Sequence, residues 1–262
     1  MHTFEQDLAL ALALADAADR ISLPRFRALD LKIETKPDLT PVTDADKSVE
    51  RALIDLLAQQ RPGEAIVGEE FGTSGQGSRK WIIDPIDGTA NFVRGVPIWA
   101  TLIALSVDQK PTVSVVSAPA LGARWWAAPG TGAYIKSISG EIRKLAVSKV
   151  SRLEDCSLSY NNLQPWQKTG FLPQLLELSE RVWRTRAYGD FWSYMLLAEG
   201  SVDVVAEHDL KIYDIAALVP IIEQAGGSIS QLQGPLTEQS SSVLATNSLL
   251  HSKIQELFRT AS

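Results

Sequence analysis

The alternation of apolar and polar positions predicts a chain of mixed helices and strands whose pattern changes near residue 147. Residues 4–26 are rich in Ala and Leu and poor in β-branched residues, which favours a helix. A second helix is predicted to begin at Asp44 or Asp46, either of which could cap it, and to run to about residue 60 with its apolar residues on one face. Residues 36–43, which contain two prolines, are expected to be non-helical.

Short apolar runs bounded by turn residues are predicted to be strands, namely 65–67, 81–83, 101–107, 113–118, 124–128 and 132–136. Pro85 is expected to end the second of these strands, and residues 72–78 are expected to form a loop. After residue 147, strands are predicted at 157–160, 182–186 and 202–206, and helices at 172–181, 191–199, 215–225 and 248–259. Pro220 predicts a kink or a restarted turn in the helix over 215–225. The chain is therefore expected to have two halves, 1–146 and 147–262, each with α and β layers.

Composition and charge narrow the class of protein. The chain has 262 residues, 45% of them hydrophobic and 21% charged, as in folded globular proteins. A net charge of −6 makes nucleic acid a poor partner. The single cysteine, Cys156, excludes an internal disulfide and a Cys-based zinc cage, and fits a reducing compartment. The longest N-terminal apolar run, residues 8–15, is too short for a signal sequence or a membrane span, so we expect a soluble, cytoplasmic protein.

The segment over residues 81–89 carries the most informative chemistry. Asp84 and Asp87 follow an apolar strand on either side of Pro85, so both carboxylates can converge at the end of that strand. Gly88 and Thr89 then start a predicted helix, whose free N–H groups suit an anion. Mg²⁺ binds carboxylate oxygens and shares them with phosphate oxygens, so the segment suggests an Asp–Mg²⁺–phosphate site. A helix cap for Asp87 and a turn for Asp84 explain this short motif equally well.

Three more acidic residues are candidates for the same chemistry. Glu69 follows the predicted strand 65–67, and Asp214 comes just before the predicted helix 215–225. Asp44 precedes the second helix. Each has a simpler explanation in isolation: Glu69 as a solvated loop residue, and the two aspartates as helix caps.

Four motifs taken in order resemble the signatures of the inositol monophosphatase superfamily. They are Thr-Asp-Ala-Asp at 43–46, Gly-Glu-Glu at 68–70, Asp-Pro-Ile-Asp-Gly-Thr at 84–89, and Tyr-Asp-Ile-Ala-Ala at 213–217 with Gly-Gly at 226–227. The resemblance implies an α+β fold, a layered αβαβα sandwich. It also implies a lithium-sensitive, Mg²⁺-dependent phosphomonoesterase that forms a homodimer.

The resemblance also implies roles for particular residues. The metal ligands would be Glu69, Asp84, the carbonyl of Ile86, Asp87 and Asp214, holding two or three Mg²⁺ ions, with Mn²⁺ as an alternative. Asp44 and Thr89 would orient the attacking water, which is bound to the metal on Glu69. Asp87, Gly88 and Thr89 would hold the phosphate. Two metal ions about 3.5–4 Å apart would neutralise the phosphate and align the attacking and leaving oxygens.

Other segments resemble the bacterial histidinol-phosphate phosphatase branch of the superfamily, which serves histidine biosynthesis. They cover residues 91–105, 117–120, 124–127 and 186–194. That substrate carries an ammonium group and an imidazole, for which a carboxylate and an aromatic wall are suitable partners. Asp190, Glu207 and Arg186 are the candidate substrate-binding residues, although Asp190 could equally be a helix cap.

Two alternatives differ in substrate and in class of protein. The first is an inositol-1-phosphatase or a broad sugar phosphatase, because the shared motifs do not select a substrate. The second is a non-catalytic protein that binds Mg²⁺ and phosphorylated ligands. The complete set of acidic ligands, the water-orienting pair and the phosphate-binding turn argue against the second alternative.

Overall fold

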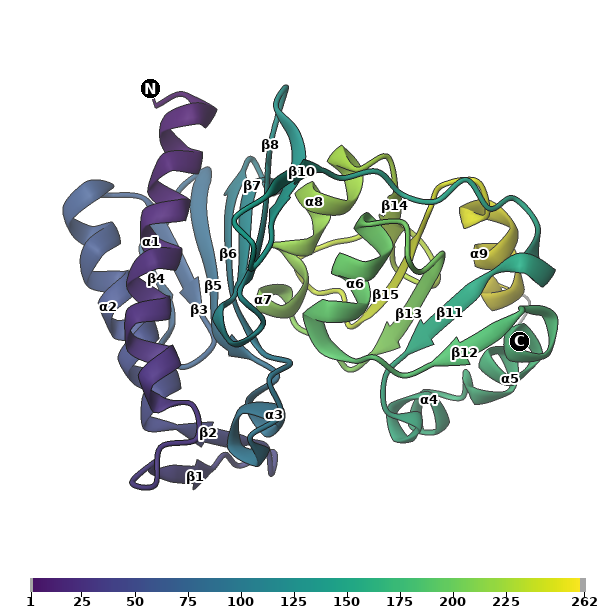
Figure 1. Cartoon of the computed structure of the whole chain (residues 1–262), viewed down its shortest axis with the longest axis horizontal. Helices are drawn as coiled ribbons and strands as arrows, with labels where there is room; N and C mark the ends of the chain where they lie inside the picture. Colours follow the sequence, from purple (N-terminus) through teal and green to yellow (C-terminus); the bar gives the residue numbers. More distant parts are fainter. Residues whose placement is uncertain (1, 260–262) are drawn as a thin grey trace.

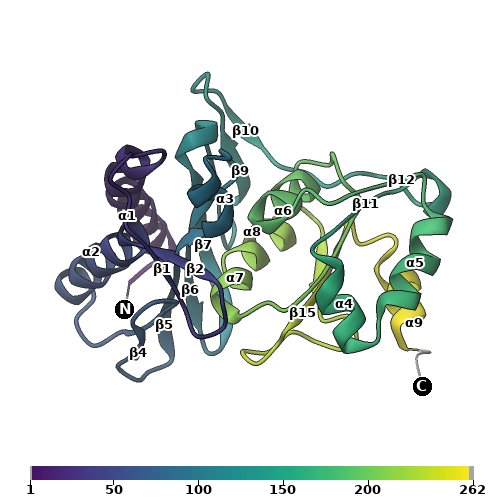
Figure 2. The ribbon, with the colours of Figure 1, turned by 90° about the horizontal axis from the view of Figure 1, so that it is seen from below.

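Five alternating layers of helices and sheets make up the computed structural model, which describes residues 2–259 (Figure 1). Helices α1 (Phe4–Arg25) and α2 (Asp44–Gln60) form the first outer layer and lie side by side on one face of the first sheet (Figure 2). A helical layer lies between this sheet and the second sheet, and further helices cover the far side of the second sheet. The predicted αβαβα sandwich is confirmed.

The first sheet has eight strands in the order β10-β9-β8-β7-β6-β5-β3-β4. Neighbours in this sheet pair antiparallel except β3 and β5, which are parallel. The central strands are buried over most of their length because both faces of the sheet are covered. The strands are β3 (Ala65–Gly68), β4 (Gly72–Ser74), β5 (Arg79–Asp87), β6 (Ala100–Val107), β7 (Lys110–Ala118), β8 (Ala123–Ala128), β9 (Gly132–Lys136) and β10 (Ile142–Lys144).

The middle layer consists of α6 (Asp190–Ala198), α7 (Ile212–Ile215) and α8 (Leu218–Gln224). These helices share one buried apolar cluster with the inner faces of both sheets. The predicted interruption at Pro220 is confirmed: the helix stops after α7 and restarts at α8. Pro220 falls in the first turn of α8, where its missing N–H breaks no helical hydrogen bond.

The second sheet has five strands in the order β12-β11-β13-β15-β14. Its strands are β11 (Ser157–Tyr160), β12 (Arg184–Arg186), β13 (Val204–His208), β14 (Ser228–Ser230) and β15 (Ser242–Thr246). The outer helices are α4 (Leu163–Thr169), α5 (Leu172–Arg181) and α9 (His251–Arg259). Short 3₁₀ turns occur at Pro119–Leu121 and Leu153–Asp155.

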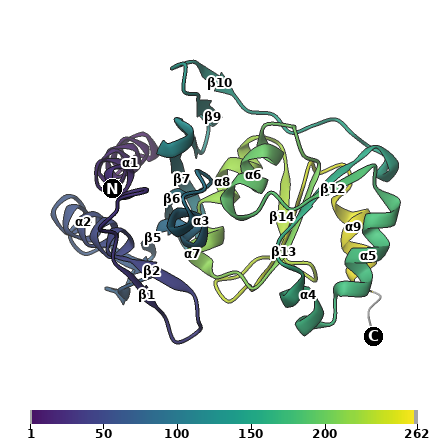
Figure 3. The ribbon, with the colours of Figure 1, turned by 60° about the horizontal axis from the view of Figure 1, so that its bottom comes forward.

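A hairpin of β1 (Ile33–Thr35) and β2 (Pro41–Thr43) lies at the same end of the first sheet as the short helix α3 (Thr89–Arg94) (Figure 3). Its connecting loop, residues 36–40, is non-helical as predicted. Both hairpin strands were missed because each has only three residues, too few to show an apolar alternation, and β1 is exposed. The hairpin places this loop beside the ends of β3 and β5, where the acidic residues lie.

Strand β5 differs from its prediction, because it runs through Pro85 to Asp87 instead of ending there. The pairing of β5 with β6 shifts between Asp84 and Asp87. Such a bulge can accommodate a proline in an interior strand, since the missing N–H falls where the ladder is already broken.

Several other elements were not predicted. Residues 72–74 pair as β4 in the segment expected to be a loop, and β14, β15 and α4 had no sequence prediction. Helix α2 is capped by Thr43, and neither Asp44 nor Asp46 is its N-cap. Among the described residues, no helix is long and apolar enough to cross a membrane. The division into domains at 146/147 stays a prediction.

Candidate active site

The predicted acidic residues converge where β3 and β5 end. These two strands are parallel neighbours, so their carboxyl ends lie at the same edge of the sheet. Glu69 follows β3, and Asp84 and Asp87 lie in the last four residues of β5. Helix α7 brings Asp214 to them, and one carboxylate oxygen each from Asp84, Asp87 and Asp214 lies within 4.8 Å of the others. They line a cavity of about 680 Å³.

Burial and mutual repulsion make this cluster unfavourable as a set of free anions. Burial raises the pKa of Asp84 well above its usual range, and the charges of Glu69 and Asp87 raise it further. Burial likewise raises the pKa of Asp214 to about 7. Asp84 Oδ1 is buried and has no hydrogen-bond partner among the described residues. A cation bound to these oxygens would offset both the repulsion and the missing partner.

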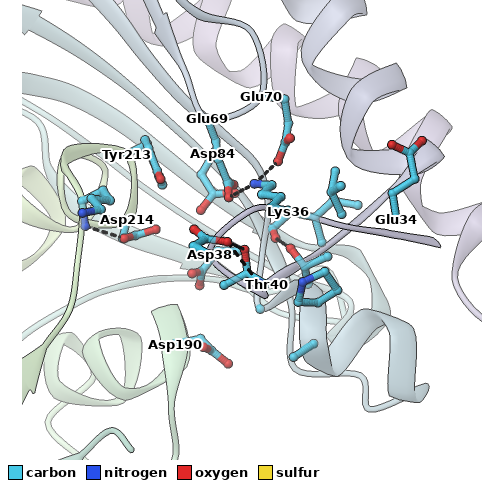
Figure 4. Close-up of a pocket in the computed structure, with 18 of the residues that line it drawn as sticks. Glu34, Lys36, Asp38, Thr40, Glu69, Glu70, Asp84, Asp190, Tyr213 and Asp214 are labelled. Carbon is cyan, nitrogen blue, oxygen red and sulfur yellow. Dashed lines mark hydrogen bonds and ion pairs between the residues drawn. The ribbon is translucent and has the colours of Figure 1, made fainter. Parts of the chain in front are cut away.

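Lys36 supplies a positive charge at the rim of the cluster. From the β1–β2 loop, its Nζ lies 2.7 Å from Glu69 Oε1 and 2.6 Å from Glu70 Oε1 (Figure 4). Asp84 lies beside Glu69, and Asp214 and Asp190 face the same space from the other half of the chain. The sequence analysis missed Lys36, because a lysine in a non-helical stretch carries no signal of what it will contact.

The side chain that contacts Thr89 is Asp46, and this corrects the predicted pairing of Thr89 with Asp44. Thr89 Oγ1 lies 3.2 Å from Asp46 Oδ1 and 2.9 Å from the carbonyl oxygen of Ile86. Asp44 instead forms an ion pair with Arg25 at 2.9 Å. Asp44 is the first residue of α2 and points toward α1, whereas Asp46 turns back toward the N-cap. A capping-box pattern, Thr43-x-x-Asp46, was the available signal.

A buried side chain of the neighbouring strand β6 fixes the turn after Asp84. Thr101 Oγ1 of β6 donates to the carbonyl of Pro85 at 2.8 Å. Gly88 has a φ of +80°, and a Cβ there would lie 3.0 Å from the carbonyl oxygen of Ile98 and 3.2 Å from Asp190 Oδ2. Both the backbone conformation and the lack of space require glycine. The turn therefore presents the Ile86 carbonyl and the start of α3 at a fixed place beside Asp87.

Asp87 also links the two halves of the chain. Its Oδ2 accepts a hydrogen bond of 2.7 Å from the N–H of Phe191, in the first turn of α6. Burial raises the pKa of Asp87 well above its usual range, and the charge of Asp190 raises it further. Asp87 therefore does not cap the helix that follows it, since Gly88 is the N-cap of α3. Its other oxygen remains available to the cavity.

Asp190 is the first residue of α6 and lines the same cavity as Asp87. It does not cap α6 with its side chain: its Oδ2 accepts from Asn91 Nδ2 at 2.8 Å. Burial raises its pKa to about 6. The structure thus places this predicted substrate-binding residue next to Asp87, across the cavity from Glu69.

Glu207 lies at a second cavity of about 300 Å³ that shares Asp87, Asp190 and Asp214 with the first. Glu207 is buried in β13, and burial raises its pKa to about 8. Tyr194 donates its hydroxyl to Glu207 Oε2 at 3.0 Å, while Glu207 Oε1 has no partner among the described residues. The second cavity therefore ends on a buried carboxylate oxygen that is free to accept a hydrogen bond.

Arg186 is not brought to either cavity. It is exposed on the edge strand β12, and its guanidinium donates to the carbonyl of Thr185 at 2.7 Å. A substrate contact for Arg186 within a single chain is therefore not supported by the structure.

The donor set fits a hard divalent cation. The converging groups are carboxylate oxygens, with a backbone carbonyl nearby, and no histidine or cysteine of the described chain joins the cluster. Such oxygens suit Mg²⁺ better than metals that prefer nitrogen or sulfur. The buried, unpaired Asp84 oxygen is the strongest single indication that a cation belongs here.

Comparison with known proteins agrees with this geometry. The profile of the inositol monophosphatase family matches residues 4–262. A histidinol-phosphatase of Mycobacterium tuberculosis is 52% identical over 95% of this chain and 96% of its own length. A histidinol-phosphatase of Streptomyces coelicolor is 50% identical over 97% of each chain.

The fold also matches solved structures. An inositol monophosphatase from Zymomonas mobilis superposes with a TM-score of 0.86 at 34% identity, covering 99% of this chain and 100% of that one. An inositol monophosphatase of Thermotoga maritima has a TM-score of 0.84 at 27% identity, covering 98% and 97%. With its acidic cluster, its layered fold and these matches over nearly its whole length, the chain belongs to the inositol monophosphatase family.

Proposed function

We propose that this chain hydrolyses L-histidinol phosphate to L-histidinol and inorganic phosphate, as a phosphoric monoester hydrolase of histidine biosynthesis. The observation that carries the proposal is the free, buried oxygen of Glu207 in the cavity that adjoins the acidic cluster. A leaving group rich in N–H donors would satisfy that oxygen. Two relatives that are about half identical over nearly their whole length are histidinol-phosphatases, which supports the same substrate.

The metal ions would be held by the carboxylates at the ends of β3 and β5 and on α7. We assign two or three Mg²⁺ ions, for which Mn²⁺ can substitute, to Glu69, Asp84, the Ile86 carbonyl, Asp87 and Asp214. When bound, Mg²⁺ neutralises the phosphate and lowers the pKa of a water molecule. We also expect inhibition by lithium, which phosphate release at increasing LiCl measures directly.

Thr89 and Asp46 would orient the attacking water. With the Thr89 hydroxyl proton directed to Asp46 Oδ1, the Thr89 oxygen turns its lone pairs toward the cavity and can accept a hydrogen bond from water. Burial raises the pKa of Asp46 to about 6, so its carboxylate can both accept and release a proton near neutral pH. Asp87 and the amides of Gly88 and Thr89 would orient the phosphate.

The leaving group would occupy the second cavity. Asp190 and Glu207 each offer a carboxylate oxygen to the ammonium group or to an imidazole N–H. Tyr194, Phe191 and His208 also line this cavity, which makes part of its wall aromatic. Two carboxylates beside an aromatic wall are better matched to a cationic amino alcohol than to a neutral polyol.

An inositol phosphatase is the second candidate. Carboxylates such as Glu207 also accept hydrogen bonds from hydroxyl groups, and the solved structures similar to this one include inositol monophosphatases. The two candidates share the metal chemistry and differ only at the second cavity, so a substrate comparison separates them.

The test measures phosphate release by the purified protein with Mg²⁺ on L-histidinol phosphate, inositol-1-phosphate, fructose-1,6-bisphosphate and adenosine 3′,5′-bisphosphate. We expect at least about a hundredfold preference in kcat/KM for histidinol phosphate, equivalent to about 2.7 kcal/mol in the transition state. In Asp190→Ala, kcat/KM should fall far more for histidinol phosphate than for inositol-1-phosphate. Equal rates of the native protein on histidinol phosphate and inositol-1-phosphate would contradict the assignment of histidinol phosphate as the substrate.

We further infer that the protein acts as a homodimer. The edge strand β12, with the exposed Trp183 beside it, is a surface that a second copy could cover. Light scattering coupled to size exclusion measures the mass, and a monomer at micromolar concentration would contradict this inference.

A further inference from the structure

Glu50 is a buried carboxylate near the candidate metal ligands that the proposed mechanism does not use. It lies on α2 with no exposed surface. It follows Asp46 by one helical turn, so both side chains leave the same face of α2. Asp46 reaches Thr89, and Glu50 reaches the end of β3.

The carboxylate of Glu50 holds the backbone of the turn that carries Glu69. Glu50 Oε2 accepts from the N–H of Glu70 at 2.8 Å, and Glu50 Oε1 accepts from the N–H of Phe71 at 2.9 Å. Both donors come directly after Glu69, at the point where β3 ends. Two hydrogen bonds from consecutive amides to one carboxylate restrict the position of the turn more than a single contact would.

Gly68 completes the fit on the other side of Glu69. A Cβ at Gly68 would lie 1.9 Å from Glu50 Oε1 and 2.4 Å from Glu50 Cδ. The backbone of Gly68 is not in the left-handed region, so the carboxylate of Glu50 is what excludes a larger residue. The turn over residues 68–71 is therefore folded closely around Glu50, with Glu69 at its centre.

We propose that Glu50 is a positioning residue that fixes the Glu69 turn in the geometry that binds the metal ion. The proposal rests on the metal-dependent function above and extends it to a residue that does not contact metal or substrate. One face of α2 then sets two parts of the site at once, the Asp46–Thr89 pair and the Glu69 turn. A purely structural role for Glu50 would stabilise the fold without changing metal affinity.

The first test compares Mg²⁺ binding to the native protein, Glu50→Gln and the control Asp55→Asn by titration calorimetry without substrate. Gln keeps the size of the side chain but turns an NH₂ group toward one of the two backbone donors. Asp55 is an exposed carboxylate on the same helix, so its variant matches the loss of one charge. We expect the Mg²⁺ Kd of Glu50→Gln to rise about 10- to 100-fold, as for other residues that orient metal ligands, and that of Asp55→Asn to change less than about twofold.

A second pair of variants separates position from charge. Gly68→Ala leaves every charge in place but pushes against the Glu50 carboxylate, and we expect it to raise the Mg²⁺ Kd by a similar factor. In a Glu50→Ala background the carboxylate that obstructs the new Cβ is gone, so adding Gly68→Ala should change the Mg²⁺ Kd little further. This non-additivity is the signature of one shared contact.

Urea unfolding of the metal-free variants provides the readout for a merely structural role. Unchanged Mg²⁺ Kd values in folded Glu50→Gln and Gly68→Ala, with only the free energy of unfolding lowered, would overturn the inference. That result would leave the proposed function intact if the native protein still releases phosphate. No Mg²⁺ binding and no phosphate release by the native protein would instead overturn the proposed function.

Discussion

At the residue scale, the site depends on which of two similar aspartates faces Thr89. Asp44 and Asp46 are two residues apart at the start of the same helix, and both are compatible with the motif. In the structure Asp46 accepts from the N–H of its cap, Thr43, at 2.8 Å and reaches Thr89 with its other oxygen. Asp44 faces Arg25 on α1. A helix turns by about 100° per residue, so side chains two positions apart point in nearly opposite directions.

We predict that Asp46→Asn lowers kcat by about 100-fold or more, because an amide cannot take up the Thr89 proton. Asp44→Asn should keep kcat within about tenfold, since it only loses a partly exposed ion pair with Arg25. Steady-state phosphate release at saturating Mg²⁺ measures both. The opposite ranking of the two variants would show that the structure assigns the wrong aspartate to Thr89.

At the element scale, the packing of β13 against α4 places a histidine where protonation is unfavourable. His208, at the end of β13, is buried, with Trp166 of α4 edge-on at 4.5 Å and Phe171 stacked at 5.3 Å between ring centres. Burial lowers its pKa from 6.5 to about 4. No sequence signal indicated this cluster, because α4 was not predicted and its contact with β13 joins distant parts of the chain.

This lowered pKa makes stability depend on pH. Between about pH 6.5 and pH 4 the unfolded chain binds a proton at His208 that the folded chain does not, so the free energy of unfolding falls as the pH falls through this window. As the pH falls from 8, the free energy of unfolding of His208→Phe should fall by less than that of the native protein. The difference between the two proteins should grow by up to about 1.4 kcal/mol per pH unit. Urea unfolding at pH 8, 6, 5 and 4.5 measures this difference. Parallel pH profiles for the two proteins would refute the prediction.

At the scale of the whole molecule, the two sheets share one core. Met195 of α6 and Leu218 of α8 belong to the same buried cluster as Leu102 of the first sheet and Val205 and Val243 of the second. The acidic cluster is shared in the same way, since Asp84 and Asp87 come from one half and Asp214 from the other. A middle layer that serves both sheets should couple their stability.

We therefore predict that Met195→Ala destabilises both sheets together, by about 2–5 kcal/mol, because Met195 is fully buried in the shared layer. Hydrogen exchange followed by mass spectrometry reports on β6 and β13 separately. Protection in both should fall by a similar factor. Loss of protection in only one sheet would indicate two independently folding domains.

The sequence by itself determined the family, the five-layer fold and the identity of the acidic residues that converge. The family and the fold follow from the resemblance of four motifs that occur in order between residues 43 and 227. Within one motif, the relative placement of Asp84, Asp87 and Gly88 follows from local backbone geometry.

Only the tertiary structure decided the contacts between segments that are distant in sequence. It brought Lys36 to Glu69, Glu50 to the turn after β3, and Asp46 instead of Asp44 to Thr89. It also placed Arg186 away from both cavities. A pattern of polar and apolar positions specifies which face of an element is buried, but the partner on the other side depends on how whole elements pack, and that information is not local.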